Sequence, residues 1–259
     1  MARGPNWQRN ELLLALNLYC KLPFGQYHSG NPEIQALAKT IHRTPNAVAM
    51  KLSNFASLDP YHQQRGIAGL TNTSKADRAI WEEFNNNWTA LAIESENAYR
   101  TLVTGTSNDS EAPPVVEGLD IASAVTEKEQ QVKVRIGQSF FRTVILNSYQ
   151  QRCCVCGLPI PEMLIASHIV PWSVDQKNRL NPQNGLCLCV LHDRGFDRGF
   201  VSIGDNYELI LGSKLTRYLP DETVESYFAA YDRKPIHLPD KFVPSMELLA
   251  IHRTTIFSG

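Results

Sequence analysis

The chain lacks any apolar run long enough to cross a membrane. None of its 259 residues lies in a stretch that approaches the roughly twenty apolar residues of a spanning helix. The start of the chain also lacks the apolar core of a signal peptide. We therefore expect a protein that makes no membrane contact and is located in the cytoplasm.

A net charge of one sign is missing as well, because the formal net charge is −1. The charge is nevertheless unevenly distributed. Residues 1–78 hold nine Lys/Arg against four Asp/Glu, 131–200 hold eight against four, and 79–130 hold two against ten. Two basic blocks separated by an acidic connector are typical of a protein that binds phosphate groups.

Cysteine is sparse, and five of the six residues lie between Cys153 and Cys189. Disulfides are rare in a chain without an export signal, so this clustering favours metal ligation. Cys153 and Cys156 are separated by two residues, and so are Cys189 and His192. These four residues have the spacing of a Cys₃His zinc site.

The N-terminal part has helical periodicity. Apolar residues recur at helical spacing from Trp7 to Cys20, a second helix is expected after Asn31, and Thr44 is a good N-cap for a third. Three short helices with a tight turn before the third predict a helix-turn-helix that binds DNA. A purely structural third helix would explain the same pattern nearly as well. The candidate DNA contacts are Arg43, Asn46, Lys51 and Asn54.

The remaining organisation divides the chain into three parts. A long amphipathic helix is expected from Lys75 to about Leu102, which closes a helical domain over 1–102. Residues 103–130 are acidic, contain adjacent prolines and show no periodicity, so they predict a flexible linker. The alternation in Val132–Ile136 predicts a strand at the start of a second domain over 131–259, followed by a helix from Phe140 to Tyr149.

Three residues, in chain order, have the side chains that phosphodiester hydrolysis needs. His168 lies in a run suited to a strand and can act as a general base near neutral pH. Asn184 lies in a turn-forming stretch from which its amide could hold the His168 ring or its strand. The segment from Cys189 to about residue 199 is expected to be a helix that carries metal ligands, including His192.

This ordered set resembles the HNH nuclease family, whose ββα-metal motif is named after a histidine on a strand, an asparagine in a loop and a histidine on a helix. The resemblance extends from about Val132 to Ile203. It implies an α+β protein with a helical N-terminal domain and a C-terminal ββα-metal nuclease domain. It also implies hydrolysis of double-stranded DNA, in which His168 activates water and Asn184 orients it.

The family pattern leaves two assignments open for His192. In the first, His192 completes the structural zinc site with the three cysteines, and Asp193 and Asp197 bind the catalytic cation. In the second, His192 and Asp197 are the catalytic ligands, and the cysteines form a partial zinc site or none. In both, acidic ligands favour Mg²⁺ or Mn²⁺ as the catalytic cation. Two further residues of this helix, Arg194 and Arg198, are candidate phosphate contacts.

A DNA-reading domain joined to a small nuclease suggests a restriction or phage-defence enzyme. Whether it recognises a plain sequence or a modified base stays open. Cutting both strands with one active site per chain favours a homodimer, although the sequence shows no dimer seam. The alternative is a zinc-stabilised DNA-binding or regulatory protein with an inactive nuclease centre.

Overall fold

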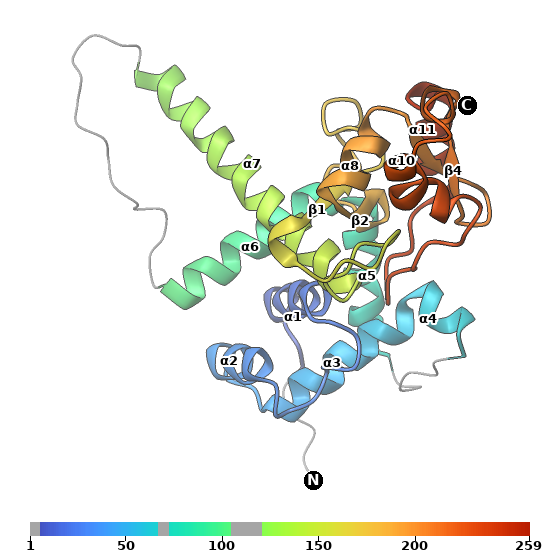
Figure 1. Cartoon of the computed structure of the whole chain (residues 1–259). Helices are drawn as coiled ribbons and strands as arrows, with labels where there is room; N and C mark the ends of the chain where they lie inside the picture. The colour runs from blue at the N-terminus through green and yellow to red at the C-terminus, as the bar shows by residue number, and fades with distance from the viewer. Residues whose placement is uncertain (1–5, 67–72, 105–120) are drawn as a thin grey trace. The chain divides into compact units, whose positions relative to one another are not determined.

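The chain forms two compact units, which contain residues 1–140 and 141–259 (Figure 1). The structure is a computed structural model, and it describes residues 6–66, 73–104 and 121–259, without the side chains of 103, 104 and 121–131. Helices predominate, and two small antiparallel sheets accompany them, so the predicted α+β class is confirmed. None of the described helices is long and apolar enough to span a membrane.

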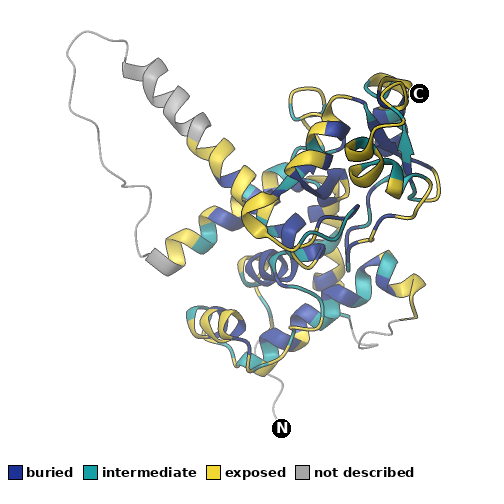
Figure 2. Cartoon of the chain, viewed as in Figure 1, coloured by how far each residue is buried: buried dark blue, intermediate teal, exposed yellow. Residues whose placement is uncertain are grey.

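The first unit is built around a central helix, α1 (Arg9–Lys21). Every residue from Leu12 to Cys20 is buried, and a helix that is covered on all sides lies at the centre of its domain (Figure 2). Four helices contact it: α2 (Pro32–Thr40), α3 (Pro45–Leu58), α5 (Lys75–Asn86) and α6 (Trp88–Thr104).

The predicted starts of α2 and α3 are confirmed. The Asn31 side chain accepts hydrogen bonds from the backbone of Glu33 and Ile34, and the Thr44 hydroxyl accepts one from Ala47. Both caps satisfy amide groups that a helix N-terminus leaves unpaired. The short helix α4 (Pro60–Gln64), which begins after Asp59, was not predicted.

The single long helix expected from Lys75 to Leu102 was wrong, because the structure has two helices that divide at Asn87. Three consecutive asparagines, 85–87, precede the break. Asparagine is a weak helix former that competes for backbone hydrogen bonds. Accordingly, the Asn87 side chain accepts from the backbone of Ala90 in the first turn of α6. The low helix propensity of asparagine therefore ended the first helix, although the apolar residues continue at helical spacing.

The strand expected at Val132–Ile136 was also wrong, because these residues belong to α7 (Ile121–Ser148). Val132 and Val134 are exposed, whereas Ile136, Phe140 and Val144 recur every four residues and are buried. The longer helical period therefore outweighed a short local alternation. The predicted linker begins within α6 and ends within α7, and its middle, 105–120, lies outside the described residues.

The second unit contains the hairpin and the helix that the ββα-metal motif requires. Strands β1 (Leu164–His168) and β2 (Gly185–Cys189) pair antiparallel, and α8 (Val190–Asp197) follows β2 directly. Helix α8 contacts both strands. The remaining elements are β3 (Val201–Ile203), β4 (Leu209–Leu211), α9 (Ser213–Thr216), α10 (Glu222–Tyr227) and α11 (Met246–Thr255), with 3₁₀ turns at Pro161–Met163, Pro182–Asn184 and Ala229–Tyr231.

A buried histidine attaches the last helix to α8. The His252 ring stacks on Phe196 at 3.7 Å between centroids, its Nδ1 lies 2.8 Å from the Ser202 hydroxyl, and its Nε2 donates to the Phe196 carbonyl. Burial lowers the pKa of His252 to about 4, although the hydrogen bond to the Phe196 carbonyl opposes this shift. The packing of α11 on α8 therefore requires a neutral imidazole.

This pKa predicts a loss of stability in mild acid. An unfolded histidine has a pKa of about 6.5, so the stabilisation is complete above that pH and is lost as the pH falls towards about 4. Between pH 7.5 and 5.0 the loss should be about 2 kcal/mol. Urea unfolding at the two pH values measures it, and His252→Gln should lose less stability over the same interval. An equal loss in the variant would contradict this assignment.

Candidate active site and metal centre

The register of the β1–β2 hairpin separates two clusters of functional side chains. His168 pairs with Gly185 at one end, and Leu164 pairs with Cys189 at the other. Four residue steps along a strand cover about 13 Å. The candidate base therefore lies at one end of the hairpin, and the cysteine that leads into α8 lies at the opposite end.

The His168 ring is held on three sides. It stacks on Phe141 with 4.1 Å between centroids and 8° between planes, and the Trp172 ring meets it edge-on at 5.6 Å. Its Nε2 lies 2.9 Å from the backbone oxygen of Arg179. A carbonyl oxygen only accepts hydrogen bonds, so Nε2 carries the proton and Nδ1 retains a free lone pair. This tautomer is the one that can accept a proton from water at Nδ1.

The electrostatic setting of His168 favours the same state. Burial lowers the pKa of His168, while its hydrogen bond to the Arg179 carbonyl opposes the shift. A lowered pKa keeps the ring neutral at neutral pH, which is the form that a general base requires.

Gly185 makes room for the aromatic support of His168. A Cβ atom at this position would lie 2.8 Å from Ile145 Cγ1 and 2.9 Å from Phe141 Cζ, closer than side-chain packing allows. Phe141 can therefore lie against His168 because the residue paired with His168 has no side chain. A glycine is needed after Asn184 because a side chain there would clash with Ile145 and Phe141. Its backbone angles are those of an ordinary strand residue.

Asn184 holds the loop that follows His168 and does not face solvent. Its side chain is fully buried; the oxygen accepts from the Val170 amide at 2.8 Å, and the nitrogen donates to the carbonyls of Val170 and Asn178. Its amide atoms bind the backbone, and the expectation that Asn184 orients the attacking water stays a prediction. It positions the end of the strand that carries His168, which was the other role considered.

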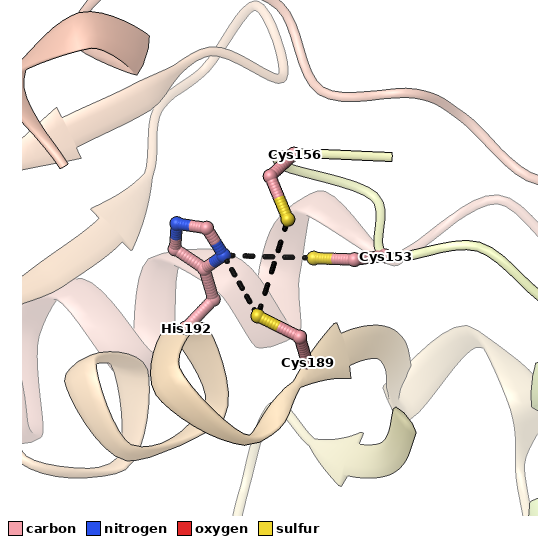
Figure 3. A group of neighbouring side chains, drawn as sticks. All are labelled: Cys153, Cys156, Cys189 and His192. Carbon is pink, nitrogen blue, oxygen red and sulfur yellow. Dashed lines mark hydrogen bonds between the residues drawn. The ribbon is translucent and has the colours of Figure 1, made fainter. Parts of the chain in front are cut away.

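Four side chains converge at the other end of the hairpin. Cys153, Cys156, Cys189 and His192 each direct one donor atom to a common point, and all four atoms lie within 4.8 Å of one another (Figure 3). His192 Nδ1 lies 3.2 Å from Cys189 Sγ and 3.6 Å from Cys153 Sγ, and the sulfur atoms of Cys156 and Cys189 are 4.0 Å apart. A tetrahedral zinc ion with Zn–S bonds of about 2.3 Å requires donor separations of roughly 3.5–3.8 Å. The donor set therefore fits zinc in both chemistry and spacing.

The second nitrogen of His192 is also engaged. Nε2 lies 2.9 Å from the backbone oxygen of Tyr227, the last residue of α10, so it donates there and leaves Nδ1 to the cluster. A metal-bound histidine is normally fixed in this way through its other nitrogen. Both ring nitrogens are therefore engaged, which favours the first of the two assignments for His192. A role for His192 as a catalytic residue or as a ligand of the catalytic cation stays a prediction.

The other two clustered cysteines behave as core thiols. Within the cluster, hydrogen bonds from Cys153 and Cys156 lower the pKa of Cys189, whereas the pKa values of Cys153 and Cys156 are raised. Burial raises the pKa of Cys187 to about 12 and also raises that of Cys154, and neither sulfur belongs to the group of four donor atoms. These two residues therefore stay protonated beside the cluster.

Two carboxylates on α8 are the remaining candidate ligands. Burial raises the pKa of Asp193, although a hydrogen bond from the Ser167 hydroxyl and the charge of Arg194 oppose this shift. Burial and the Asp193 charge raise the pKa of Asp197. Ser167 immediately precedes His168, and its buried hydroxyl makes no hydrogen bond of regular geometry within the described part of the chain. Burial and the Asp193 charge thus disfavour the charged form of Asp197. Binding of a hard cation by these two carboxylates stays a prediction.

Comparison with known proteins agrees with this geometry. Residues 153–204 match the model of the HNH endonuclease family named HNH_2. The chain contains an HNH endonuclease domain. Members of this family hydrolyse phosphodiester bonds, and the match includes both the cysteine cluster and the candidate base. No curated protein matches the chain.

The solved structures that the chain resembles in part include the modification-dependent TagI restriction endonuclease, with a TM-score of 0.33 and 19% sequence identity. The similarity covers 44% of this chain and 36% of that chain, so the two proteins are alike over a limited region.

The HNH domain presents two of the predicted phosphate contacts at its surface. Arg194 and Arg198 lie on and just after α8, and both are exposed. Contact with DNA through these two residues stays a prediction.

In the first unit, three of the four predicted DNA contacts are used internally. Lys51 forms a buried ion pair with Asp77 at 2.6 Å, and Asn54 donates to the same carboxylate. Arg43 pairs with Glu11 through two hydrogen bonds, of 2.9 and 2.8 Å. Of the four, only Asn46 is classed as exposed. The helical pattern located the segment correctly, but it did not show that these polar side chains have partners within the domain.

Sequence reasoning did not identify the residues that surround the base. Phe141 lies within an expected helix, and neither Trp172 nor Arg179 was predicted to contact His168. No local pattern indicates that the Arg179 carbonyl returns to His168.

Zinc removal should destabilise the HNH domain. The purified protein should contain one zinc per chain, and a strong chelator should remove it and lower the melting temperature, because the ligands join β2, α8 and the 153–156 turn. Cys156→Ala should have the same effect. Cys187→Ala is the matched control and should retain its zinc. Equal zinc loss in both variants, or a protein purified without zinc, would contradict the assignment.

The buried ion pair of the first unit gives a second test. Lys51→Ala leaves the fully buried Asp77 carboxylate without its cation, so the unit should lose about 3 kcal/mol of unfolding free energy. Urea unfolding measures this loss, and the exposed Lys39→Ala should stay within about 0.5 kcal/mol of the parent. Unchanged stability with weaker DNA binding would instead identify Lys51 as a DNA contact.

Proposed function

We propose that the protein is a DNA endonuclease of the restriction or phage-defence type that depends on Mg²⁺ or Mn²⁺. The observation that carries this proposal is the state of His168: its Nε2 proton is bound by a backbone carbonyl, its pKa is lowered, and its Nδ1 is left as a proton acceptor. A neutral, oriented imidazole at the end of a hairpin is the group that in-line attack by water needs.

In the proposed reaction, His168 Nδ1 takes a proton from the attacking water. Asn184 keeps the backbone after the strand in place, so that the His168 ring does not shift when the substrate binds. Phe141 stacks against a face of the ring and supports it. The products are expected to be a 5′-phosphate and a 3′-hydroxyl.

The proposed cation site consists of Asp193, Asp197 and the Ser167 hydroxyl. Its oxygen-only donors and the raised pKa values of the two aspartates support a hard divalent cation there. A cation bound at this site would stabilise negative charge on the phosphate and on the leaving oxygen. The exposed Arg194 and Arg198 are proposed to contact neighbouring phosphates.

The zinc site is proposed to be structural. Its four protein ligands leave no open position for water or substrate, as in other zinc sites that only stabilise a fold. The catalytic and structural metals would then be different ions in different places.

Residues 1–102 are proposed to recognise DNA, with 103–130 connecting them to the nuclease domain over 131–259. Lys51, Asn54 and Arg43 form contacts within the domain. Of the four candidate DNA contacts, Asn46 is therefore the one that is exposed, at the start of α3. A DNA-recognition domain joined to a nuclease domain supports a restriction role. Cleavage of both DNA strands favours a homodimer.

The proposal predicts metal-dependent cleavage that is lost without His168. Purified protein is incubated with supercoiled plasmid, unmodified or base-modified, in Mg²⁺, Mn²⁺ or EDTA, and structured RNA is run beside it. Cleavage of DNA should require the metal and should fall by about 10²–10⁴-fold in His168→Ala. His237→Ala, an exposed histidine of the same unit, is the matched control and should cleave normally.

Each other outcome has a definite meaning. Intact DNA binding without cleavage of any substrate would support the alternative, a zinc-stabilised binding protein with an inactive nuclease centre. Preferential cleavage of RNA would contradict the DNA assignment. Equal activity in His168→Ala and the parent would remove His168 as the base.

A further inference from the structure

The loop between β1 and β2, residues 169–184, contains a closed set of contacts around the base. Arg179 Nε donates to the Trp172 backbone oxygen at 2.8 Å, and the Arg179 guanidinium lies over the Trp172 ring, 5.3 Å from its centroid. Each of these residues also touches His168: the Arg179 carbonyl accepts from Nε2, and the Trp172 ring meets the imidazole edge-on. The three residues therefore support one another.

These contacts tie together the two ends of an exposed arch. Residues 173–178 lie between Trp172 and Arg179, and Val174 at its surface is 70% exposed. The ends of so exposed an arch stay together only through direct contacts; Asn184 supplies some of them by binding Val170 and Asn178, and Arg179 supplies another. The guanidinium makes that contact twice, through a hydrogen bond and over an aromatic face, which a planar cation can do at once.

The position of the Arg179 carbonyl depends on this arrangement. The carbonyl that fixes the His168 tautomer belongs to the residue whose side chain grips Trp172. Movement of that residue would therefore displace the acceptor of the Nε2 proton. Asn184 secures the loop from the other side, through the Asn178 carbonyl.

Contact with DNA phosphate is the competing role for Arg179. Its Nε hydrogen is already committed to the Trp172 carbonyl and the side chain is partly buried, whereas Arg194 and Arg198 are exposed. The observations therefore favour an internal role for Arg179.

We infer that Arg179 and Trp172 are positioning residues that hold the His168 imidazole in its base-competent tautomer. This inference rests on the proposed function, in which His168 is the base. Neither side chain has to touch the substrate, since both act through the histidine.

Substitutions separate this role from phosphate binding. Arg179→Lys keeps a positive charge but lacks both the Nε hydrogen and the planar group, so it should fail as Arg179→Ala does. Trp172→Phe keeps an aromatic face and should be milder than Trp172→Ala. Arg217→Ala is the matched control, because Arg217 Nε also donates to a backbone oxygen, that of Lys214 at 3.0 Å, and its guanidinium lies over Tyr218.

The direct readout is the imidazole Nε2 proton of His168 in the full chain, observed by ¹⁵N-resolved NMR and assigned by its absence in His168→Ala. Its bond to the Arg179 carbonyl slows exchange with water, so the resonance should be visible in the parent and in Arg217→Ala. It should be lost in both Arg179 variants. A resonance that persists in Arg179→Ala would overturn the inference.

Kinetics on DNA give the second readout. Both Arg179 variants should lower kcat by about 10- to 100-fold through misplacement of the base, with the KM and the Kd for DNA changed by less than about threefold. Weakened DNA binding in Arg179→Ala that Arg179→Lys restores would overturn the inference in favour of a phosphate contact. The NMR readout does not depend on cleavage, so a failure of the proposed function would be distinguished from a failure of this inference.

Discussion

The pairing of β1 with β2 in one register is the constraint on which the site depends. Because His168 pairs with Gly185, Phe141 of α7 fits against the imidazole. A residue with a side chain at position 185 would clash with Phe141. The same register places Cys189 at the far end, where α8 begins. A slip by one residue would turn His168 to the opposite face and would separate Cys189 from its partners. The candidate base and the cysteine cluster are therefore positioned by a single set of backbone hydrogen bonds.

The proposed division into two metal sites follows from that arrangement. His192 uses Nδ1 for the cysteine cluster and Nε2 for the Tyr227 carbonyl, so the helix is anchored at its first turn. The carboxylates of Asp193 and Asp197 follow along α8, and Asp193 approaches the strand residue that precedes His168. In this account the zinc site sets the position of α8, and α8 in turn presents the proposed cation ligands to the base.

Much of this arrangement could be predicted from the sequence. The caps at Asn31 and Thr44, the strand before His168 and the helix after Cys189 follow from local propensity and short periodicity. The spacing of Cys153, Cys156, Cys189 and His192 predicted the cluster, but it left two assignments for His192. The direction of the two ring nitrogens, which the sequence does not show, favours the assignment to the cysteine cluster. The Phe141 stack, the Arg179 carbonyl and the burial of Lys51 depend on contacts distant in sequence, which no local pattern encodes.

The most direct test of this account is DNA cleavage by a His192→Cys variant that retains its zinc. A fourth thiolate at this position can replace the histidine in the structural site, because Cys₄ and Cys₃His sets both hold zinc. If His192 only anchors α8, the variant should bind one zinc per chain and cleave DNA at a rate within several-fold of the parent. A variant that keeps zinc and folds normally but no longer cleaves would show that His192 belongs to the catalytic centre, and it would contradict the separation of the two sites.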